Sequence, residues 1–203
     1  IIPSPDIGFF VEKADFTPLD ADVRVEHEDG ANIVSAQVWL EPLAPNDVVI
    51  YSPSPALAGV MGLNVARNPG TGRWTVTGAA SAEVYTEVLQ SFELRNNGPR
   101  VEYLGSADRT VRFQVTDERD VLALGSRPIR LLPVNDPPVP YDVTFTMLED
   151  GTLEGSLEAY DPDGDMITFY SGCPPKKGTL AVDGTPSLDN APFYYEPFPD
   201  ESG

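Results

Sequence analysis

Cysteine and histidine are nearly absent from this chain of 203 residues. It has one cysteine, Cys173, and one histidine, His27. A disulfide within the chain is therefore excluded, and neither a hydrolase triad nor a zinc site with histidine and cysteine ligands can be assembled. We expect a protein that is not an enzyme and whose stability comes from packed cores or bound metal. Cys173, which precedes two prolines, is predicted to be a small buried residue, or to pair with a cysteine outside this segment.

Basic residues are also scarce, with 13 lysines and arginines against 32 aspartates and glutamates and a formal net charge of −19. Such an excess of acid argues against nucleic acid and against an anionic membrane surface as partners. No apolar run approaches the roughly 20 residues of a membrane-spanning helix, and the first five residues do not form a signal peptide. We expect no membrane contact by this segment, and any export or anchoring signal is expected outside it.

Proline and glycine, by contrast, are plentiful, with 21 and 17 copies spread along the chain. Between them lie short stretches in which apolar and polar residues alternate, as they do in half-buried strands. Strands are predicted at residues 8–16, 22–28, 33–40, 47–51, 73–77, 92–94, 109–115, 128–134, 143–148, 153–157, 166–170, 177–182 and 193–196. This pattern predicts an all-β fold of sandwich domains.

One helix interrupts the predicted strands, at residues 82–92. Ser81 precedes it as a suitable N-cap, and Glu83 lies in its first turn. Apolar residues recur on it at helical spacing, namely Tyr85, Val88, Leu89 and Phe92. We predict that this face packs on the core and is not a binding surface.

A proline-stiffened junction, Pro-Val-Asn-Asp-Pro-Pro, occupies residues 133–138. It predicts one domain at residues 1–136, which carries the helix, and a second at residues 137–203. About five strands fall in the second domain, too few for a closed sandwich. The second domain is therefore expected to be truncated, the N-terminal part of a sandwich within a longer polypeptide.

Acidic residues gather on the C-terminal side of this junction. From residue 137 onward, 13 carboxylates face two bases, Lys176 and Lys177. Residues 161–165, Asp-Pro-Asp-Gly-Asp, set three carboxylates at alternate positions, and Gly164 allows the loop to fold so that they converge. Oxygen ligands of this kind suit calcium, although the loop is not an EF-hand, because Gly172 stands where a bidentate glutamate is needed. An ordinary polar turn is the competing interpretation.

The order of these motifs resembles the tandem cadherin-like repeats of giant extracellular adhesins and fibre proteins. The matching segments are Val-Asn-Asp-Pro-Pro at 134–138, Glu-Asp-Gly at 149–151, Asp-Pro-Asp-Gly-Asp at 161–165, Lys-Gly-Thr-Leu at 177–180 and Phe-Tyr-Tyr-Glu-Pro at 193–197. Residues 10–136 resemble a longer variant of the same repeat that contains a helix. The resemblance implies Ig-like, Greek-key β-sandwiches along nearly the whole chain.

The resemblance also implies calcium (Ca²⁺) at the domain junctions. The implied ligands are Asn135, Asp136, Glu149, Asp161, Asp163 and Asp165, with Asp117 contributing from a strand end of the first domain. In the first domain, Glu12 stands where the junction acid is expected, and Glu26 and Glu28 replace the aspartate loop. The longer glutamates and the intervening His27 depart from the family pattern at that end.

The function implied by the resemblance is structural, in a long extracellular filament or adhesin at the cell surface. Its partners would be neighbouring repeats of the same longer chain or other subunits of a fibre, and a flagellar mastigoneme-type fibre and a bacterial surface adhesin both fit. The alternative is an adhesion module that binds a glycan or a protein through the aromatic residues Tyr170, Phe193, Tyr194 and Tyr195. Alternation places Tyr194 on the opposite side from Phe193 and Tyr195, which favours core packing for part of this group.

Overall fold

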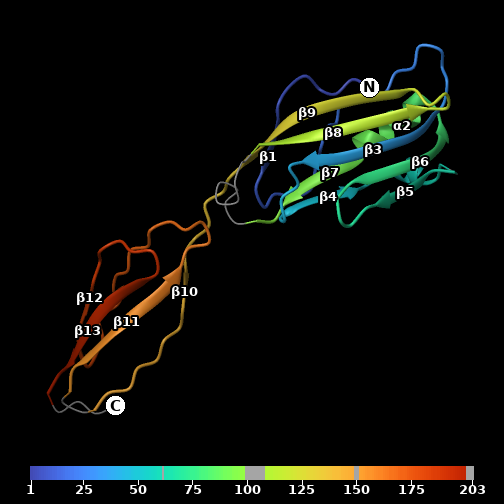
Figure 1. The fold of residues 1–203 in the computed structure, drawn as a ribbon. Coiled ribbons are helices and arrows are strands. Elements are labelled where there is room, and N and C mark those ends of the chain that lie inside the picture. Colours follow the sequence, from blue (N-terminus) through green and yellow to red (C-terminus); the bar gives the residue numbers. More distant parts are fainter. Residues whose placement is uncertain (61, 99–107, 149–150, 200–203) are drawn as a thin grey trace. The chain divides into compact units, whose positions relative to one another are not determined.

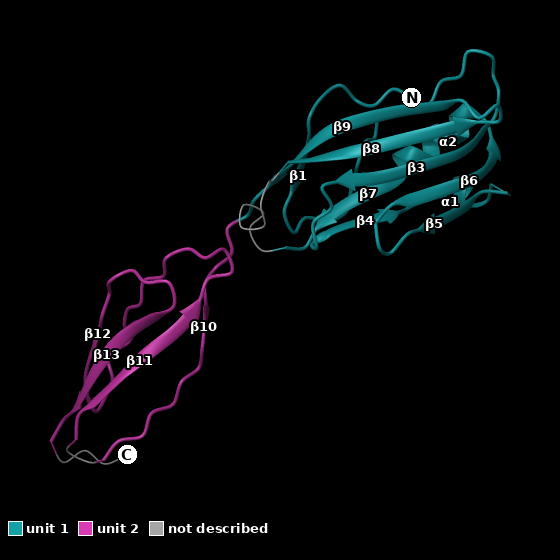
Figure 2. Ribbon diagram, in the orientation of Figure 1, with its two compact units in different colours: residues 1–134 teal, residues 135–203 magenta. Residues whose placement is uncertain are grey.

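The structure, a computed structural model, describes residues 1–60, 62–98, 108–148 and 151–199 (Figure 1). The chain forms two compact units, Ile1–Val134 and Asn135–Gly203 (Figure 2). This boundary lies two residues before the predicted one. Strands dominate both units, which confirms the all-β sandwich fold that the alternating pattern predicts.

A six-stranded sheet forms one layer of unit 1. Its spatial order is β1 (Gly8–Val11), β9 (Leu122–Leu132), β8 (Asp108–Asp117), β3 (Ile33–Glu41), β6 (Trp74–Ala80) and β5 (Asn64–Arg67). Neighbouring strands are antiparallel except at one edge, where β1 runs parallel to β9 and Gly8 through Val11 pair with Ile129 through Leu132. The first strand of the unit is thereby bonded directly to its last.

A smaller sheet of three strands forms the opposite layer of unit 1, in the order β2 (Thr17–Pro18), β7 (Phe92–Asn96) and β4 (Asp47–Tyr51). Between the layers lies a core of buried side chains that alternate along the strands, as in β8, where Val111, Phe113 and Val115 point inward. Phe92 from β7 meets Trp74 from β6 with ring centroids 5.8 Å apart. The two layers therefore share one continuous core, as a sandwich requires.

Two helices accompany the strands of unit 1. The predicted helix is α2 (Ala82–Gln90), in which the Ser81 side chain accepts the Val84 N–H and Tyr85, Val88 and Leu89 are fully buried, as predicted. A shorter helix, α1 (Pro55–Ala58), was not predicted; it begins where Ser54 accepts the Leu57 N–H at 3.1 Å. Neither helix is long and apolar enough to cross a membrane, within the part of the chain that the structure describes.

A buried ion pair lies in unit 1. The Arg109 Nε donates to the Asp47 carboxylate at 2.7 Å, and both side chains are almost fully buried. Asn96 Nδ2 and the Ala44 N–H donate to the same carboxylate at 2.8 and 3.0 Å. Because charges are costly to bury without partners, this network fixes β4, β7 and β8 in one arrangement.

Unit 2 contains a four-stranded antiparallel sheet in the order β10 (Val139–Pro140), β11 (Leu153–Tyr160), β13 (Asn190–Pro197) and β12 (Gly178–Val182). Phe145, from the extended segment that precedes β11, packs on Phe193 with ring centroids 4.8 Å apart. The buried apolar side chains of this unit, within its described residues, are Ala159, Ile167, Ala191 and Phe193. Its core is therefore small.

Three strand predictions do not hold. Residues 22–28 bury Val23 and Val25 as alternation predicts, but they make a single bridge, between Ile2 and Arg24, and no ladder. Residues 166–170 likewise make one bridge, between Ile167 and Ser187, and residues 143–148 are in no strand. Alternation reports which side chains point inward, whereas a ladder also needs a neighbouring backbone. The prediction that Cys173 is buried is wrong, because its side chain is exposed.

Candidate metal centre

The loop after β11 brings three carboxylates together. Asp161 Oδ1 accepts the backbone N–H groups of Asp163 and Asp165 at 2.8 and 3.3 Å, and the Gly164 N–H donates to the Asp161 carbonyl at 3.0 Å. Gly164 has a φ of +73°, a conformation that glycine adopts without strain. The curled loop places one oxygen from each of Asp161, Asp163 and Asp165 within 4.8 Å of one another.

Asp163 is the most enclosed of the three, with 1% of its surface exposed. Its Oδ2 accepts the backbone N–H of Asp136 in a short hydrogen bond, and Asn135 Nδ2 donates to the Asp136 carbonyl at 3.1 Å. The structure therefore brings three of the predicted ligands together, Asp161, Asp163 and Asp165. Asn135 and Asp136 lie at the start of unit 2, and one backbone hydrogen bond joins them to the loop, but the Asp136 carboxylate is not part of the cluster.

The donor set of this cluster suits a hard cation. Carboxylate and amide oxygens are the ligands of calcium, whereas zinc and copper prefer the nitrogen and sulfur that histidine and cysteine supply. Three carboxylates within 4.8 Å also repel one another, a cost that a bound cation would offset. The residues present thus fit calcium in type and in convergence. Glu149, the sixth ligand predicted in this unit, lies outside the described residues.

Glu12 lies at the end of unit 1 from which the chain leaves. It follows β1, its N–H donates to the Leu132 carbonyl at 2.9 Å, and its Oε2 accepts the Val134 N–H at 3.2 Å. Its side chain is nearly fully buried, with 2% exposed. The parallel pairing of β1 with β9 fixes this position, because it sets Val11 beside Leu132.

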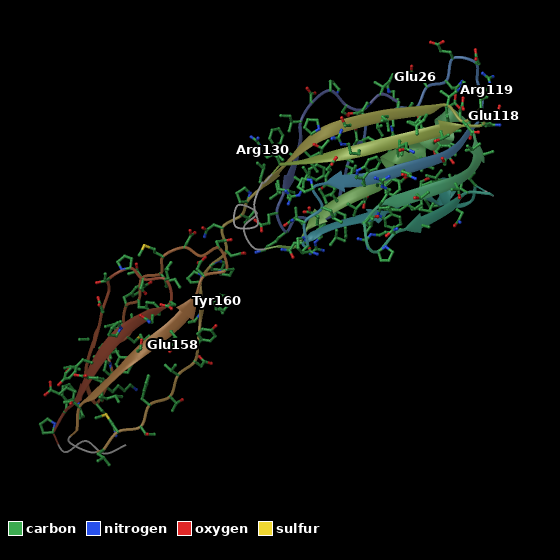
Figure 3. All side chains as sticks on the ribbon, in the orientation of Figure 1. Glu26, Glu118, Arg119, Arg130, Glu158 and Tyr160 are labelled. Atoms are coloured by element: carbon green, nitrogen blue, oxygen red, sulfur yellow. The ribbon has the colours of Figure 1, made fainter. Side chains whose placement is uncertain are left out.

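Asp117 lies at the other end of unit 1. β9 begins beside it at Leu122 and then runs 11 residues to Leu132, roughly 30 Å at about 3.3 Å per residue. Asp117 therefore groups with residues 26–29 and not with Glu12 or Val134. Figure 3 shows Glu26 and Arg119 at this end of unit 1 and Arg130 toward the other.

Two of the acids at this end, Asp117 and Asp29, have partners within the protein. Asp117 accepts the N–H groups of Arg119 and Val121, each at 2.8 Å, and its Oδ2 lies 3.1 Å from His27 Nε2. These contacts, with the Val121 N–H first, hold the pKa of Asp117 below its ordinary 3.8. Arg119 pairs with Asp29 at 3.0 Å, while Glu26 and Glu28 are exposed at the rim of an open cavity of about 340 Å³.

The fold and the acidic loop define an all-β sandwich protein with a candidate calcium centre. No family model and no curated protein matches the chain. Among solved structures, a type I cohesin–dockerin complex from Clostridium thermocellum is similar at 12% identity and a TM-score of 0.35, over 62% of this chain and 90% of that chain. Titin domains in complex with telethonin are similar at 11% identity and a TM-score of 0.26, over 97% and 81%. Similarities this low support no inference about function.

Proposed function

We propose that this chain is a structural segment of a long extracellular filament or cell-surface adhesin, built from cadherin-like β-sandwich repeats with calcium at their joint. The observation that carries the proposal is the convergence of Asp161, Asp163 and Asp165, with the buried Asp163 bonded to the Asp136 N–H. Backbone hydrogen bonds shape the loop, but they leave the repulsion among the three carboxylates uncompensated, and a bound cation would offset it.

Calcium, when bound, would supply a cross-link between two segments of unit 2. The loop at residues 161–165 would offer three carboxylates, and the segment at residues 135–136 is held to Asp163 by the Asp136 N–H. Asn135 directly follows Val134, the last residue of unit 1. Fixing Asn135 and Asp136 to the loop would therefore reduce the bending freedom of the chain at the boundary between the units.

Calcium titration of the whole chain, followed by calorimetry, tests the centre. We expect binding that Asp163→Asn weakens strongly, since this change removes a charge from the most enclosed ligand. Asp183→Asn is the matched control, because Asp183 also accepts a backbone N–H in a turn of unit 2, from Thr185 at 2.9 Å, but lies outside the cluster. Equal calcium affinity in the two variants would reject the centre.

Small-angle scattering with calcium and with a chelator tests the joint separately. We expect a longer and narrower distribution of end-to-end distances with calcium, because the boundary bends less. An unchanged distribution, combined with normal calcium binding, would refute stiffening and leave the centre itself in place.

The alternative function, adhesion through aromatic residues of unit 2, has weaker support. Phe193 has 8% of its surface exposed and packs on Phe145, whereas Tyr194 points to the other side of β13 with 39% exposed. Tyr170 has 83% exposed and lies outside the strands. The four aromatic residues therefore do not form one platform.

A further inference from the structure

The outward face of the six-stranded sheet in unit 1 carries both polar and exposed apolar side chains, the latter including Phe9 of β1 and Leu122 and Leu124 of β9. Trp39 lies at the middle of this face. Alternation along β3 turns Val38 and Leu40 into the core and Trp39 outward, where it is half-buried. The ladders place Trp39 beside Arg112 of β8, and Arg112 beside Ser126 of β9. These three side chains form one row across the sheet.

Arg73 holds Trp39 in place from one side. Its guanidinium lies over the indole ring, 3.8 Å from the ring centroid, and its Nη1 donates to Gln37 Oε1 at 2.7 Å. Stacking of this kind restrains both side chains. The ring is therefore pre-organised, which lowers the entropy that a ligand would lose on binding it.

A groove of about 280 Å³ adjoins the same ring. Trp39, Glu41, Arg112, Leu124 and Ser126 are among the residues that line it, and Arg73 is not. Arg112 Nε donates to Glu41 Oε2 at 2.9 Å. The remaining guanidinium N–H groups and carboxylate lone pairs at this rim can still donate and accept hydrogen bonds. The groove thus combines an aromatic wall with paired donors and acceptors.

The charge of this sheet face differs from that of the chain as a whole. Its ionised side chains are Arg73, Arg112 and Arg130 against Glu41 and Asp108, whereas the chain carries −19. A polyanion would be repelled by the rest of the protein, and a strongly basic partner would meet three arginines here. A neutral ligand meets neither obstacle.

We infer that this groove, named here the Trp39 groove, binds a neutral glycan. The apolar face of a hexopyranose ring packs on the indole, as apolar surface does on aromatic side chains, and its hydroxyl groups exchange hydrogen bonds with Arg112, Glu41 and Ser126. A peptide that adds a strand binds along a sheet edge, whereas this groove lies on the outward face of the sheet, among side chains of β3, β8 and β9. The site does not depend on calcium.

The test uses the whole chain, with EDTA present, and neutral oligosaccharides as probes: cellohexaose, laminarihexaose, mannohexaose and xylohexaose. Binding is measured by calorimetry and by tryptophan emission. We expect at least one probe to bind, and Trp39→Ala to weaken it by at least about tenfold, the loss typical of an anchor residue. The matched control is Tyr170→Ala, which removes an exposed aromatic of unit 2 and should leave the affinity unchanged.

Two further variants keep the test decisive if Trp39→Ala fails to fold. Arg112→Ala leaves the Trp39–Arg73 stack in place and should weaken binding while the melting temperature holds. Trp39→Phe keeps a smaller ring and should bind with an affinity between that of the unaltered chain and that of Trp39→Ala. The inference is overturned if none of the four probes binds, if these variants bind as tightly as the unaltered chain, or if polygalacturonate binds more tightly than every neutral probe.

Discussion

The two units of this chain differ in what can hold them together. Unit 1 buries side chains from both sheets and from α2, together with the Asp47–Arg109 pair. Unit 2 buries few apolar side chains among its described residues, and it gathers three carboxylates in one loop. The comparison teaches that any dependence of stability on a cation should be confined to unit 2.

The acids of the two units also have different neighbours. In unit 1, Asp117 lies against His27 and Asp29 pairs with Arg119, so side chains that carry or can take up positive charge share those sites. In unit 2, backbone N–H groups shape the loop around Asp161. Acidic stretches thus lead to ion pairs at Asp117 and Asp29 in one unit and to a candidate metal site in the other.

The largest expected effect on stability comes from breaking the ion pair of unit 1. Arg109→Met should lower the free energy of unfolding by about 3–5 kcal/mol, because it leaves the Asp47 charge buried without its partner. Urea denaturation followed by tryptophan emission measures it, and both tryptophans, Trp39 and Trp74, lie in unit 1. The double variant Asp47→Asn with Arg109→Met should be less damaging, and a double variant worse than the single would contradict this account.

The next largest effect is stabilisation by calcium, which should differ between the two units. At a calcium concentration about 100 times the dissociation constant, unit 2 should gain about 2.7 kcal/mol. Hydrogen exchange should show added protection in β11 and the loop at residues 161–165 and none in β3 of unit 1. Asp163→Asn should abolish the gain, and Asp183→Asn should keep it. Protection that rises equally in both units would contradict the prediction that calcium stabilises unit 2 alone.

A smaller effect concerns pH and unit 1. The pKa of Asp117 is lower in the folded protein than its ordinary 3.8. The unfolded chain therefore takes up this proton first as the pH falls, so the contribution of Asp117 is present above 3.8 and is lost as the pH drops through its folded pKa. Melting of Asp117→Asn should vary less with pH in this range than melting of the unaltered chain. Asp183→Asn, a change in unit 2, should leave the pH dependence of the melting temperature unchanged when melting is followed by tryptophan emission.

The smallest effect concerns the surface pair of the Trp39 groove. Arg112 and Glu41 are both about half exposed, so Arg112→Ala should change the stability of unit 1 by less than about 1 kcal/mol. A larger loss in urea denaturation would mean that Arg112 acts in folding, and its effect on glycan binding could then not be assigned to contact with the ligand.

The local features of the fold were predictable from the sequence. Helix α2 follows from its cap and its apolar spacing, and β3 and β8 follow from clean alternation between turns. The convergence of residues 161–165 follows from carboxylates at alternate positions around a glycine. Each of these signals lies within about a dozen residues of sequence, where spacing alone fixes which side chains meet.

Features that depend on distant pairing were not predictable in the same way. The location of Asp117 follows from β9 turning back beside β8, which carries the exit of unit 1 to the far end from Asp117. The Trp39 groove needs β3, β8 and β9 side by side, although an outward tryptophan between the inward Val38 and Leu40 was a usable signal. Calcium and the extracellular location remain predictions.

The parallel pairing of β1 with β9 gives unit 1 a mechanical property. The chain reaches β1 from one end of the unit and leaves β9 at the other, so tension along the chain pulls these two strands past each other lengthwise. The pairs from Gly8 with Ile129 to Val11 with Leu132 then bear the load together and do not open one at a time. If the chain were pulled from its two ends, this short ladder would be loaded in shear, after the Ile2–Arg24 bridge and the Ser4–Asp20 hydrogen bond that precede it in the chain.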